Sequence, residues 1–514
     1  MISGRNGAVA ASAERGPSDG WALASLALCM LLPSLGTSIA NVALPTLAEA
    51  FAASFQQVQW VVLAYLLATT SLVVSVGRLG DVTGRRRLLM AGVCVFTAAS
   101  LLGGVASGFW LLIAARAAQG VGAAVMMALA MALVGDAVPK SRLGRAMGLL
   151  GTMSAVGTAL GPSLGGVLIA HFGWQAIFLV NVPLGALALA LVGRNLPADS
   201  PGSKARHTGF DNLGTLLLAL TLAAYALAMT LGHGAFGLAN AALLGVAALG
   251  VGLFAVVETR SASPLIRLAR LRDPALSAGL AMTALVSTVM MATLVVGPFY
   301  LARALGLDAA VVGILMSAGP AVAALGGVPA GRGVDRFGAP RITVIGLAGM
   351  AIGCFALCLA PASLGIAGYA IPIVVVTAGY ALFQTANNSA VMSDVPPDQR
   401  GVISGMLSLS RNLGLVTGAS VMGAVFACAS RTSHFAAASP EAVAAGMRVT
   451  FAVAAALVVV ALAVALASRA LSRPPGARHR ATARESGPRD RAPAAPARGA
   501  SPTEPARPPS VGPA

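Results

Sequence analysis

Two short charged segments share the pattern G-R-x-x-D-x-x-G-x-x-R in an otherwise apolar chain. GRLGDVTGRRR begins at Gly77 and GRGVDRFGAPR begins at Gly331. An aspartate among arginines can pair with a basic side chain or a helix N-terminus, and glycine permits a tight turn. Two such segments, one in each half of a protein, would hold one side shut and then release it. The predicted gate residues are Gly77, Arg78, Asp81, Gly84, Arg85, Arg87, Arg332, Asp335 and Arg341.

A second candidate is an arginine inside an apolar segment. Arg116 lies in LLIAARAAQGVGAA (111–124), and Gln119 lies one helical turn away on the same face. A charge in such a segment is unfavourable by several kcal/mol unless it is paired or faces water. Arg116 is the one basic residue that we place well inside an apolar segment, and we interpret it as a functional residue. The alternative is a structural role, in which it binds carbonyl groups of a neighbouring helix.

A third pattern consists of glycines spaced by one helical turn. Gly157, Gly161 and Gly165 follow at i, i+4 and i+8, so one face of the helix is nearly bare backbone and allows close packing. Pro162 adds a kink, and Gly166 extends the small face. Ordinary helix packing is the simpler interpretation of this segment.

A polar face marks a candidate substrate cavity. In GYALFQTANN, Tyr380, Gln384 and Asn387 or Asn388 recur at helical spacing within an apolar run. Uncharged hydrogen-bonding groups beside apolar ones suit a large, partly apolar ligand. Polar contacts between helices are the alternative. The residues expected to form the facing wall are Asn41, Trp60, Tyr65 and Met127.

The composition shows which environment surrounds these residues. Of the 514 residues, 57% are hydrophobic and 10% are charged, and the mean hydropathy is +0.83. A soluble protein of this length needs far more surface charge, and the apolar runs are close to the ~20 residues that cross a bilayer. The sequence predicts an all-α integral membrane protein. Its expected spans are 21–45, 57–77, 88–107, 109–135, 144–170, 174–193, 212–232, 237–258, 276–302, 308–330, 342–360, 366–393, 400–429 and 449–468.

Other function classes fit poorly. The net charge of +17 comes largely from Lys and Arg in short loops on one side of the membrane, so we expect no nucleic-acid partner. No G-x-x-x-x-G-K-[ST] segment is present, which disfavours an ATP-driven pump. The cysteines lie in apolar runs and are typical of buried residues. We expect no enzyme activity, cofactor or metal, and only a small-molecule substrate, protons and the bilayer as partners of a monomer.

The distribution of charge and the repeat define the organisation. Basic residues concentrate in alternate loops, which places both termini in the cytoplasm. The offset between the two gate segments exceeds one six-span bundle, and the excess matches residues 195–275. We therefore expect a cytoplasmic segment (1–20), a six-helix bundle (21–194), an inserted helix pair (195–275), a second bundle (276–470) and a disordered, basic, Pro/Ala-rich cytoplasmic tail (471–514).

In this order, the motifs resemble those of a known transporter family. GRLGDVTGRRR, LLIAARAAQGVGAA, GTALGPSLGG (157–166), WQAIFLVNVPLG (174–185) and FDNLG (210–214) are similar to motifs of the fourteen-helix drug:H+ antiporters of the major facilitator superfamily. The resemblance covers about residues 21–470. It implies fourteen transmembrane helices in two pseudo-symmetric bundles plus an inserted pair. It also implies that Arg116 takes part in proton coupling and that the glycine motif marks exporters.

The chain departs from this family in its first helix. Related exporters usually carry an aspartate just before the segment TSIANVALP, where this chain has Gly36. We expect an exporter of small amphipathic compounds in a bacterial cytoplasmic membrane that works by alternating access, with proton antiport through Asp81 or Glu49. The alternatives are an exporter of one metabolite without proton coupling, and a membrane sensor with a transporter fold.

Overall fold

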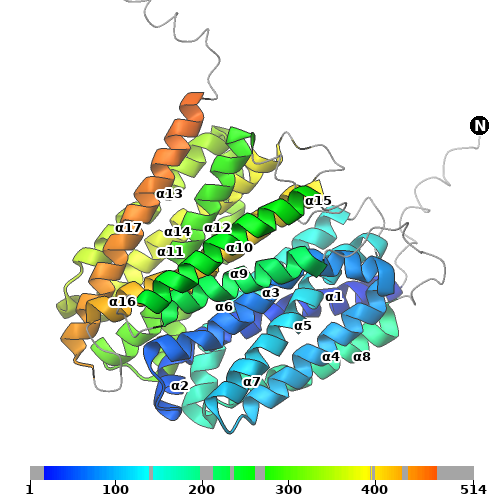
Figure 1. The fold of residues 1–514 in the computed structure, drawn as a ribbon, viewed down its shortest axis with the longest axis horizontal. Helices are drawn as coiled ribbons and strands as arrows, with labels where there is room; N and C mark the ends of the chain where they lie inside the picture. The colour runs from blue at the N-terminus through cyan, green and yellow to red at the C-terminus, as the bar shows by residue number, and fades with distance from the viewer. Residues whose placement is uncertain are drawn as a thin grey trace, which may run out of the picture. The chain divides into compact units, whose positions relative to one another are not determined.

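The computed structural model describes residues 17–137, 143–196, 212–231, 237–260, 272–393, 395, 400–430 and 438–471, without some of the side chains in these ranges. Every regular element in these ranges is helical (Figure 1), so the predicted all-α membrane fold is confirmed. The predicted tail lies outside the described residues except for Leu471.

The elements are α1 (Pro17–Val42), α2 (Leu44–Ala50), α3 (Phe55–Thr83), α4 (Arg85–Gly104), α5 (Phe109–Ala137), α6 (Leu143–Phe172), α7 (Ala176–Leu179), α8 (Asn181–Asn195), α9 (Asn212–Thr230), α10 (Leu238–Arg260), α11 (Pro274–Phe299), η4 (Tyr300–Ala304), α12 (Ala309–Phe337), α13 (Ala339–Leu359), η5 (Ala362–Leu364), α14 (Gly365–Met392), α15 (Arg400–Thr417), η7 (Gly418–Met422), α16 (Gly423–Ser430) and α17 (Pro440–Leu471).

Thirteen helical segments of the described chain are long and apolar enough to cross a membrane. They match thirteen of the fourteen predicted spans. The remaining span, 57–77, corresponds to α3, which has 29 residues and is therefore about 43 Å long. Its residues 60–77, WVVLAYLLATTSLVVSVG, are predominantly apolar and carry no charge. By length and composition, α3 can therefore also cross a bilayer.

The same pattern of helix packing occurs in both parts of the chain. In what we call the N-terminal bundle (α1–α8), α1 packs on α6 while α3 and α4 pack on α5. In the C-terminal bundle (α11–α17), α11 packs on α15 while α12 and α13 pack on α14. Each of these three N-terminal contacts thus has a counterpart between the equivalent helices. This correspondence supports the proposed division into two repeated bundles.

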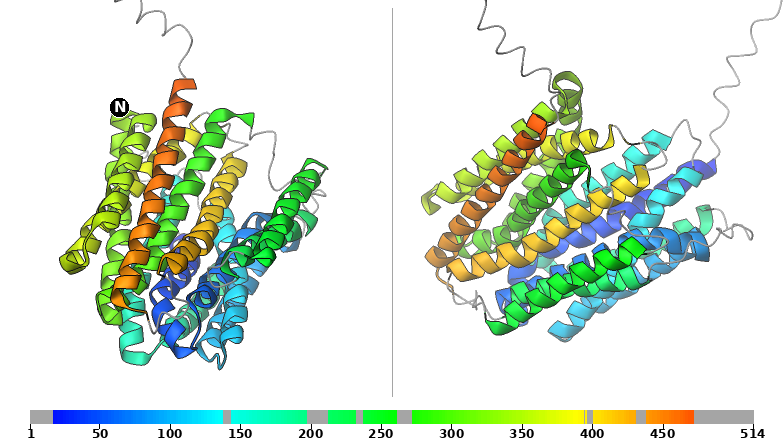
Figure 2. Two further views of the ribbon diagram at one scale, coloured as in Figure 1. Left: turned by 60° about the vertical axis from the view of Figure 1, so that its left-hand side comes forward. Right: turned by 45° about the horizontal axis from the view of Figure 1, so that its top comes forward.

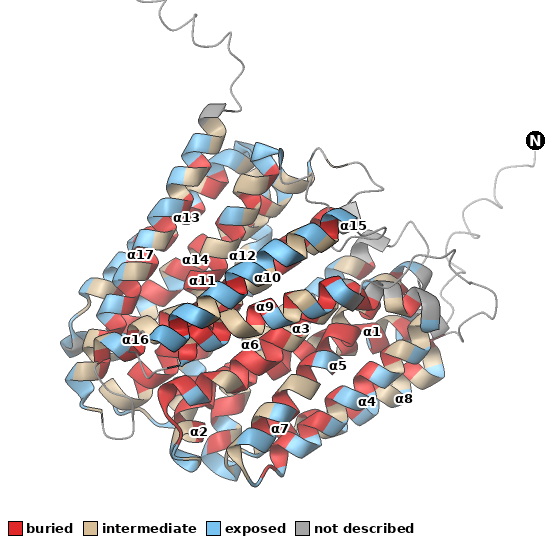
Figure 3. Cartoon of the chain, in the orientation of Figure 1, coloured by how far each residue is buried: buried red, intermediate tan, exposed pale blue. Residues whose placement is uncertain are grey.

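The helices α9 and α10, between the two bundles in the chain, lie side by side (Figure 2). α9 also packs on α3 and η7, so it contacts both bundles. Hydrogen bonds join it to α3 through Ser75 and Thr215, 2.5 Å apart, and through Trp60 Nε1 and Thr230 Oγ1, 3.1 Å apart. α10 exposes large apolar side chains, including Leu238 at 88% (Figure 3). Such a surface is suited to lipid, as expected for an inserted pair outside the two bundles.

Candidate functional site

Arg116 occupies a closed polar cluster in the N-terminal bundle. The side chain on α5 is 1% exposed. Its Nε donates to the carbonyl oxygen of Val61 on α3 at 2.7 Å, and its Nη1 donates to the carbonyl oxygen of Gly36 on α1 at 3.1 Å. The guanidinium carbon lies 4.4 Å from the centroid of the Tyr65 ring, in a cation–π contact. Arg116 therefore connects three helices.

Gln119 extends this cluster to a fourth helix. Its Oε1 accepts from Arg116 Nη1 at 2.5 Å, and its Nε2 donates to Ser100 Oγ on α4 at 2.8 Å. Tyr65 donates its hydroxyl to the carbonyl oxygen of Pro33 at 2.8 Å. Backbone carbonyls, an amide and an aromatic face thus surround the charge, while Arg116 Nη2 has no hydrogen-bond partner in the described residues. These are the contacts of a helix-connecting residue as well as of a coupling residue.

The space beside Gly36 is largely occupied. A Cβ atom at this position would lie 3.2 Å from Phe96 Cζ and 3.6 Å from Gln119 Nε2. A carboxylate at position 36 would therefore reach the Arg116 cluster, but only if the Phe96 ring moved by at least a few tenths of an ångström. In this chain, Phe96 fills space that the first-helix aspartate of the resembled exporters would need.

The glycine motif brings α6 against two different helices. Cβ atoms at Gly157, Gly161 and Gly165 would clash with α1, where they would meet Leu31 and Ser38 among other residues. Ser38 Oγ donates to the carbonyl oxygen of Gly157 at 3.1 Å, so the two helices also bond directly. This face therefore packs within the N-terminal bundle, as the spacing predicts.

Pro162 and Gly166 instead face the C-terminal bundle. A Cβ at Gly166 would overlap the carbonyl oxygen of Ala309, and a Cβ at Gly313 would overlap that of Pro162. The backbone N–H of Ser163 donates to Ser317 Oγ at 2.8 Å. The closest approach of α6 and α12 thus depends on the absence of side chains at Gly166 and Gly313.

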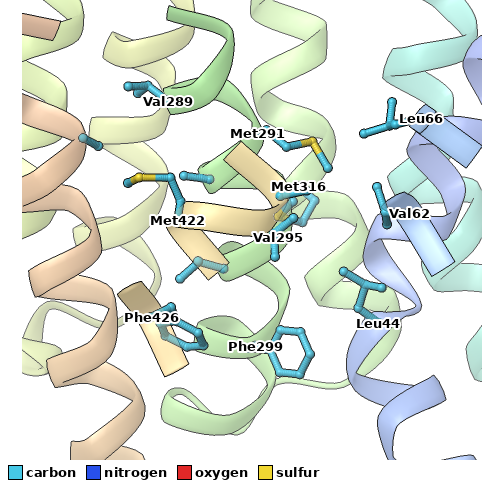
Figure 4. Packing of buried hydrophobic residues seen from close by; sticks show 14 of the residues in the cluster. Leu44, Val62, Leu66, Val289, Met291, Val295, Phe299, Met316, Met422 and Phe426 are labelled. Atoms are coloured by element: carbon cyan, nitrogen blue, oxygen red, sulfur yellow. The ribbon is translucent and has the colours of Figure 1, made fainter. Parts of the chain in front are cut away.

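The bundles also meet where α2 lies, at what we call the α2 end. Phe55 at the start of α3 lies 4.8 Å from Phe299 and 5.1 Å from Phe426, measured between ring centroids. All three rings are at most 1% exposed. Side chains of both bundles belong to this apolar cluster, as Figure 4 shows for Leu44 and Phe299 among others. An ion pair between Glu49 and Arg303 connects α2 to η4 at the same end.

The predicted gates lie at the opposite end, which we call the turn end. Gly84 between α3 and α4 has a φ of 99°, and Gly338 between α12 and α13 has a φ of 81°. Both values favour glycine, so the two copies form equivalent turns. Asp335 is exposed, as are Arg332 and Arg341.

The structure describes the side chains of the C-terminal gate segment more fully than those of the N-terminal one. In the N-terminal segment, the side chains of Arg78 and Asp81 and the burial of Gly77 lie outside the described part of the chain. Arg85 and Arg87 have further interactions in the structure. In the described part of the C-terminal copy, Asp335 forms no ion pair or hydrogen bond.

The predicted cavity residues do not form one cluster. The amide of Asn387 donates to the carbonyl oxygen of Gly279 at 3.1 Å and to Thr283 Oγ1 at 2.9 Å, so it joins α14 to α11. Trp60 binds α9, and Tyr65 belongs to the Arg116 cluster. Both amide atoms of the buried Asn41 lack hydrogen-bond partners among the described residues. The remaining residues, which are half-buried, are Met127, Tyr380, Gln384 and Asn388.

The sequence-based expectation of a single arginine inside a span is wrong. Arg411 lies in α15, within the candidate span Ile403–Ser430, and is half-buried. Its Nε is buried without a hydrogen-bond partner in the described residues, and the phenol of Tyr380 on α14 lies within its electrostatic range. The predicted span 400–429 already contained Arg411, which was the available signal, but its orientation toward α14 requires the structure.

Comparison with known proteins agrees with this architecture. The sequence profile of the Major Facilitator Superfamily matches residues 26–419. The chain belongs to the major facilitator superfamily. Its members are transporters rather than enzymes, so the protein is a multi-pass membrane transporter.

Curated relatives of the chain include transporters of several kinds. The riboflavin transporter RibZ of Clostridioides difficile is 31% identical over 77% of this chain and 86% of its own length. The multidrug resistance protein Stp of Mycobacterium tuberculosis is 32% identical over 79% and 75%. The multidrug efflux pump LfrA of Mycolicibacterium smegmatis is 30% identical over 81% and 82%. The resemblance to the fourteen-helix drug antiporters is confirmed.

Solved structures of the major facilitator superfamily share the fold. A bacterial homologue of the lysosomal transporter Spinster, in an inward-facing and occupied conformation, has a TM-score of 0.66 at 16% identity and covers 88% of this chain and 97% of its own. The nucleoside transporter NupG has a TM-score of 0.62 at 12% identity and covers 89% and 100%. At these identities the likeness concerns the fold alone.

Proposed function

We propose that the protein is a secondary active exporter of small amphipathic compounds that works by alternating access. One observation carries this proposal: the two bundles meet through buried aromatic rings and bare glycine faces at the α2 end, while Asp335 at the turn end is exposed and unpaired in the described residues. A carrier that is closed at one end and open at the other has this arrangement. A sensor that does not move has no need of gate segments in both halves.

Orientation in the membrane follows from the charges. The segments around Gly84 and Gly338 are rich in arginine, whereas the loops of the α2 end are poor in it. The positive-inside rule then places the turn end and both termini in the cytoplasm. Under this proposal the structure is open to the cytoplasm of a bacterial cell, the side from which an exporter takes up its substrate.

We propose that the protons that drive transport bind carboxylates at the two ends of the substrate pathway rather than at its middle. All Asp and Glu residues of the described helices lie near helix ends, and Glu49 is the carboxylate that joins the two bundles in the described structure. A proton on Glu49 would remove its ion pair with Arg303 and favour opening of the α2 end. The hydrogen bonds that surround Arg116 without a carboxylate favour the second candidate, an exporter of one metabolite without proton coupling.

The ion pair should contribute little by itself. Glu49 is 52% exposed and Arg303 is 29% exposed, and exposed ion pairs contribute about 0–1 kcal/mol. We expect Glu49→Gln to change the transport rate measured without a pH gradient by no more than about fivefold, because the buried rings supply most of the closure. Glu441→Gln, at an exposed acid of α17, is the matched control. A transport loss well beyond tenfold in Glu49→Gln alone would give this carboxylate a larger role than the exposed pair provides.

The proposed export is tested with purified protein in liposomes. A pH gradient is imposed across the membrane, and the movement of a panel of fluorescent dyes is followed. We expect dye movement against its concentration gradient, faster with the gradient than without it. Equal movement in both conditions would favour the uncoupled exporter, and no movement of any dye or of riboflavin would contradict the exporter proposal.

A further inference from the structure

Arg411 lies deep in the apolar part of the C-terminal bundle. Its helix, α15, continues through η7 and α16, and the candidate span covers Ile403–Ser430. Arg411 is eight residues from the start of this span, which corresponds to about 12 Å along the helix axis. The whole span has 28 residues, so the backbone of Arg411 is about 8 Å from its middle and lies within a hydrocarbon layer that is ~30 Å thick.

One face of α15 is already occupied by α11. Ser410 Oγ donates to the carbonyl oxygen of Leu280 at 2.6 Å. Cβ atoms at Gly414 and Gly418 would overlap carbonyl oxygens of α11. Ser410, Gly414 and Gly418, the first residue of η7, follow one another at one-turn spacing. With about 100° per residue, Arg411 lies about 60° from the middle of this face, and the phenol of Tyr380 on α14 lies within its electrostatic range.

Within the part of the chain that the structure describes, no carboxylate pairs with Arg411. In the described residues, its Nε has no hydrogen-bond partner and the guanidinium forms no ion pair. Every Asp and Glu of the described helices lies near a helix end, such as Glu258 in α10 and Asp335 in α12. An arginine inside a membrane is unfavourable unless it faces water or binds an anion.

Arg116 and Arg411 differ in the partners that surround their guanidinium groups. Arg116 is 1% exposed and has three hydrogen bonds and an aromatic ring around it. Arg411 is half-buried, and its buried Nε has no hydrogen-bond partner in the described residues. The two arginines therefore differ in what remains available to a ligand.

We propose that Arg411 binds an anionic group of the transported compound, a carboxylate, sulfonate or phosphate, with the Tyr380 hydroxyl as a second hydrogen-bond donor. This inference rests on the proposed exporter function and specifies its substrate class. Guanidinium groups recognise such anions through paired hydrogen bonds. Gln384, one turn from Tyr380 on the same face of α14, would contact the uncharged part of the compound.

The test uses two xanthene dyes of similar shape and opposite charge. Fluorescein is anionic and rhodamine 123 is cationic, and binding of each to purified protein in nanodiscs is measured by fluorescence anisotropy. We expect the wild-type protein to bind fluorescein more tightly. Arg411→Gln should weaken fluorescein binding about tenfold or more, the range for loss of a charge-assisted hydrogen bond, and leave rhodamine 123 binding unchanged. Tyr380→Phe should weaken fluorescein binding by a smaller factor.

Control variants separate charge recognition from damage to the fold. Arg260→Gln removes the same charge from an exposed helix end of α10 and should bind both dyes as the wild type does. Arg411→Lys keeps the charge and should retain part of the affinity. Equal losses for both dyes in Arg411→Gln, tighter binding of rhodamine 123 by the wild type, or no binding of fluorescein would overturn the inference. Selective fluorescein binding without transport in liposomes would overturn the exporter proposal and leave the anion site standing.

Discussion

Replacing Arg116 with glutamine is expected to reduce transport about 100-fold or more, which corresponds to roughly 2.7 kcal/mol. The variant removes the hydrogen bonds to the carbonyl oxygens of Val61 and Gly36 and the cation–π contact with Tyr65. Each hydrogen bond to a charged group contributes about 1.5–3 kcal/mol. Because these contacts hold α1, α3 and α5 together, their loss would uncouple helices that must move as one body.

The Arg116 prediction is measured as initial transport rate in liposomes at equal protein content. Arg116→Lys keeps the charge but not the planar guanidinium, so we expect it to recover only a small part of the rate. The melting temperature of each variant shows whether the bundle itself has failed. Wild-type transport by Arg116→Gln would contradict the role of this cluster.

Replacing Gly166 with valine is expected to reduce transport by about 30- to 100-fold. Any side chain at this position overlaps the carbonyl oxygen of Ala309 and the backbone of Gly313. Overpacking of a tight contact typically costs about 1–3 kcal/mol, and occasionally more, and here the obstacle is backbone that cannot rotate away. The variant would therefore hold the bundles apart at the α2 end and prevent that end from closing.

The same helix provides the control for Gly166. A Cβ at Gly151 of α6 would meet no atom within 4 Å, so Gly151→Val should transport like the wild type. Gly313→Val should behave like Gly166→Val, and the double variant should be little worse than either, because both disturb one contact. Normal transport by Gly166→Val would show that this contact is dispensable.

The repeated gate segments show what sequence reasoning can reach. Gly77 and Gly84 were predicted to allow a tight turn. Gly84 has a positive φ between consecutive helices, as does its equivalent Gly338, whereas Gly77 lies within α3. Hydropathy and length located the spans because a bilayer sets both. The same signal located α3, whose residues 60–77 form an uncharged apolar run.

The partners of the polar residues could not be predicted. Arg116 was recognisable because a charge inside a span is rare, but its acceptors are backbone carbonyls of other helices, and every residue has a carbonyl. Helical spacing placed Tyr380 and Asn387 near one face without showing that Asn387 binds α11. The surroundings of Arg411 could not be predicted, because its neighbours on other helices decide whether it faces lipid, protein or ligand.

In an alternating-access exporter, the two ends of the protein must open in turn. Two pairs of spin labels on α6 and α12 test this directly: Phe172 with Ala310 at the α2 end, and Gly148 with Val328 toward the turn end. Distances are measured by double electron–electron resonance in nanodiscs, with and without a transported dye and at two pH values, in a background where the native cysteines are replaced, namely Cys29, Cys94, Cys354, Cys358 and Cys428. We predict that one distance lengthens as the other shortens. Distances that stay fixed, or that change in the same direction under every condition, would contradict alternating access in this protein.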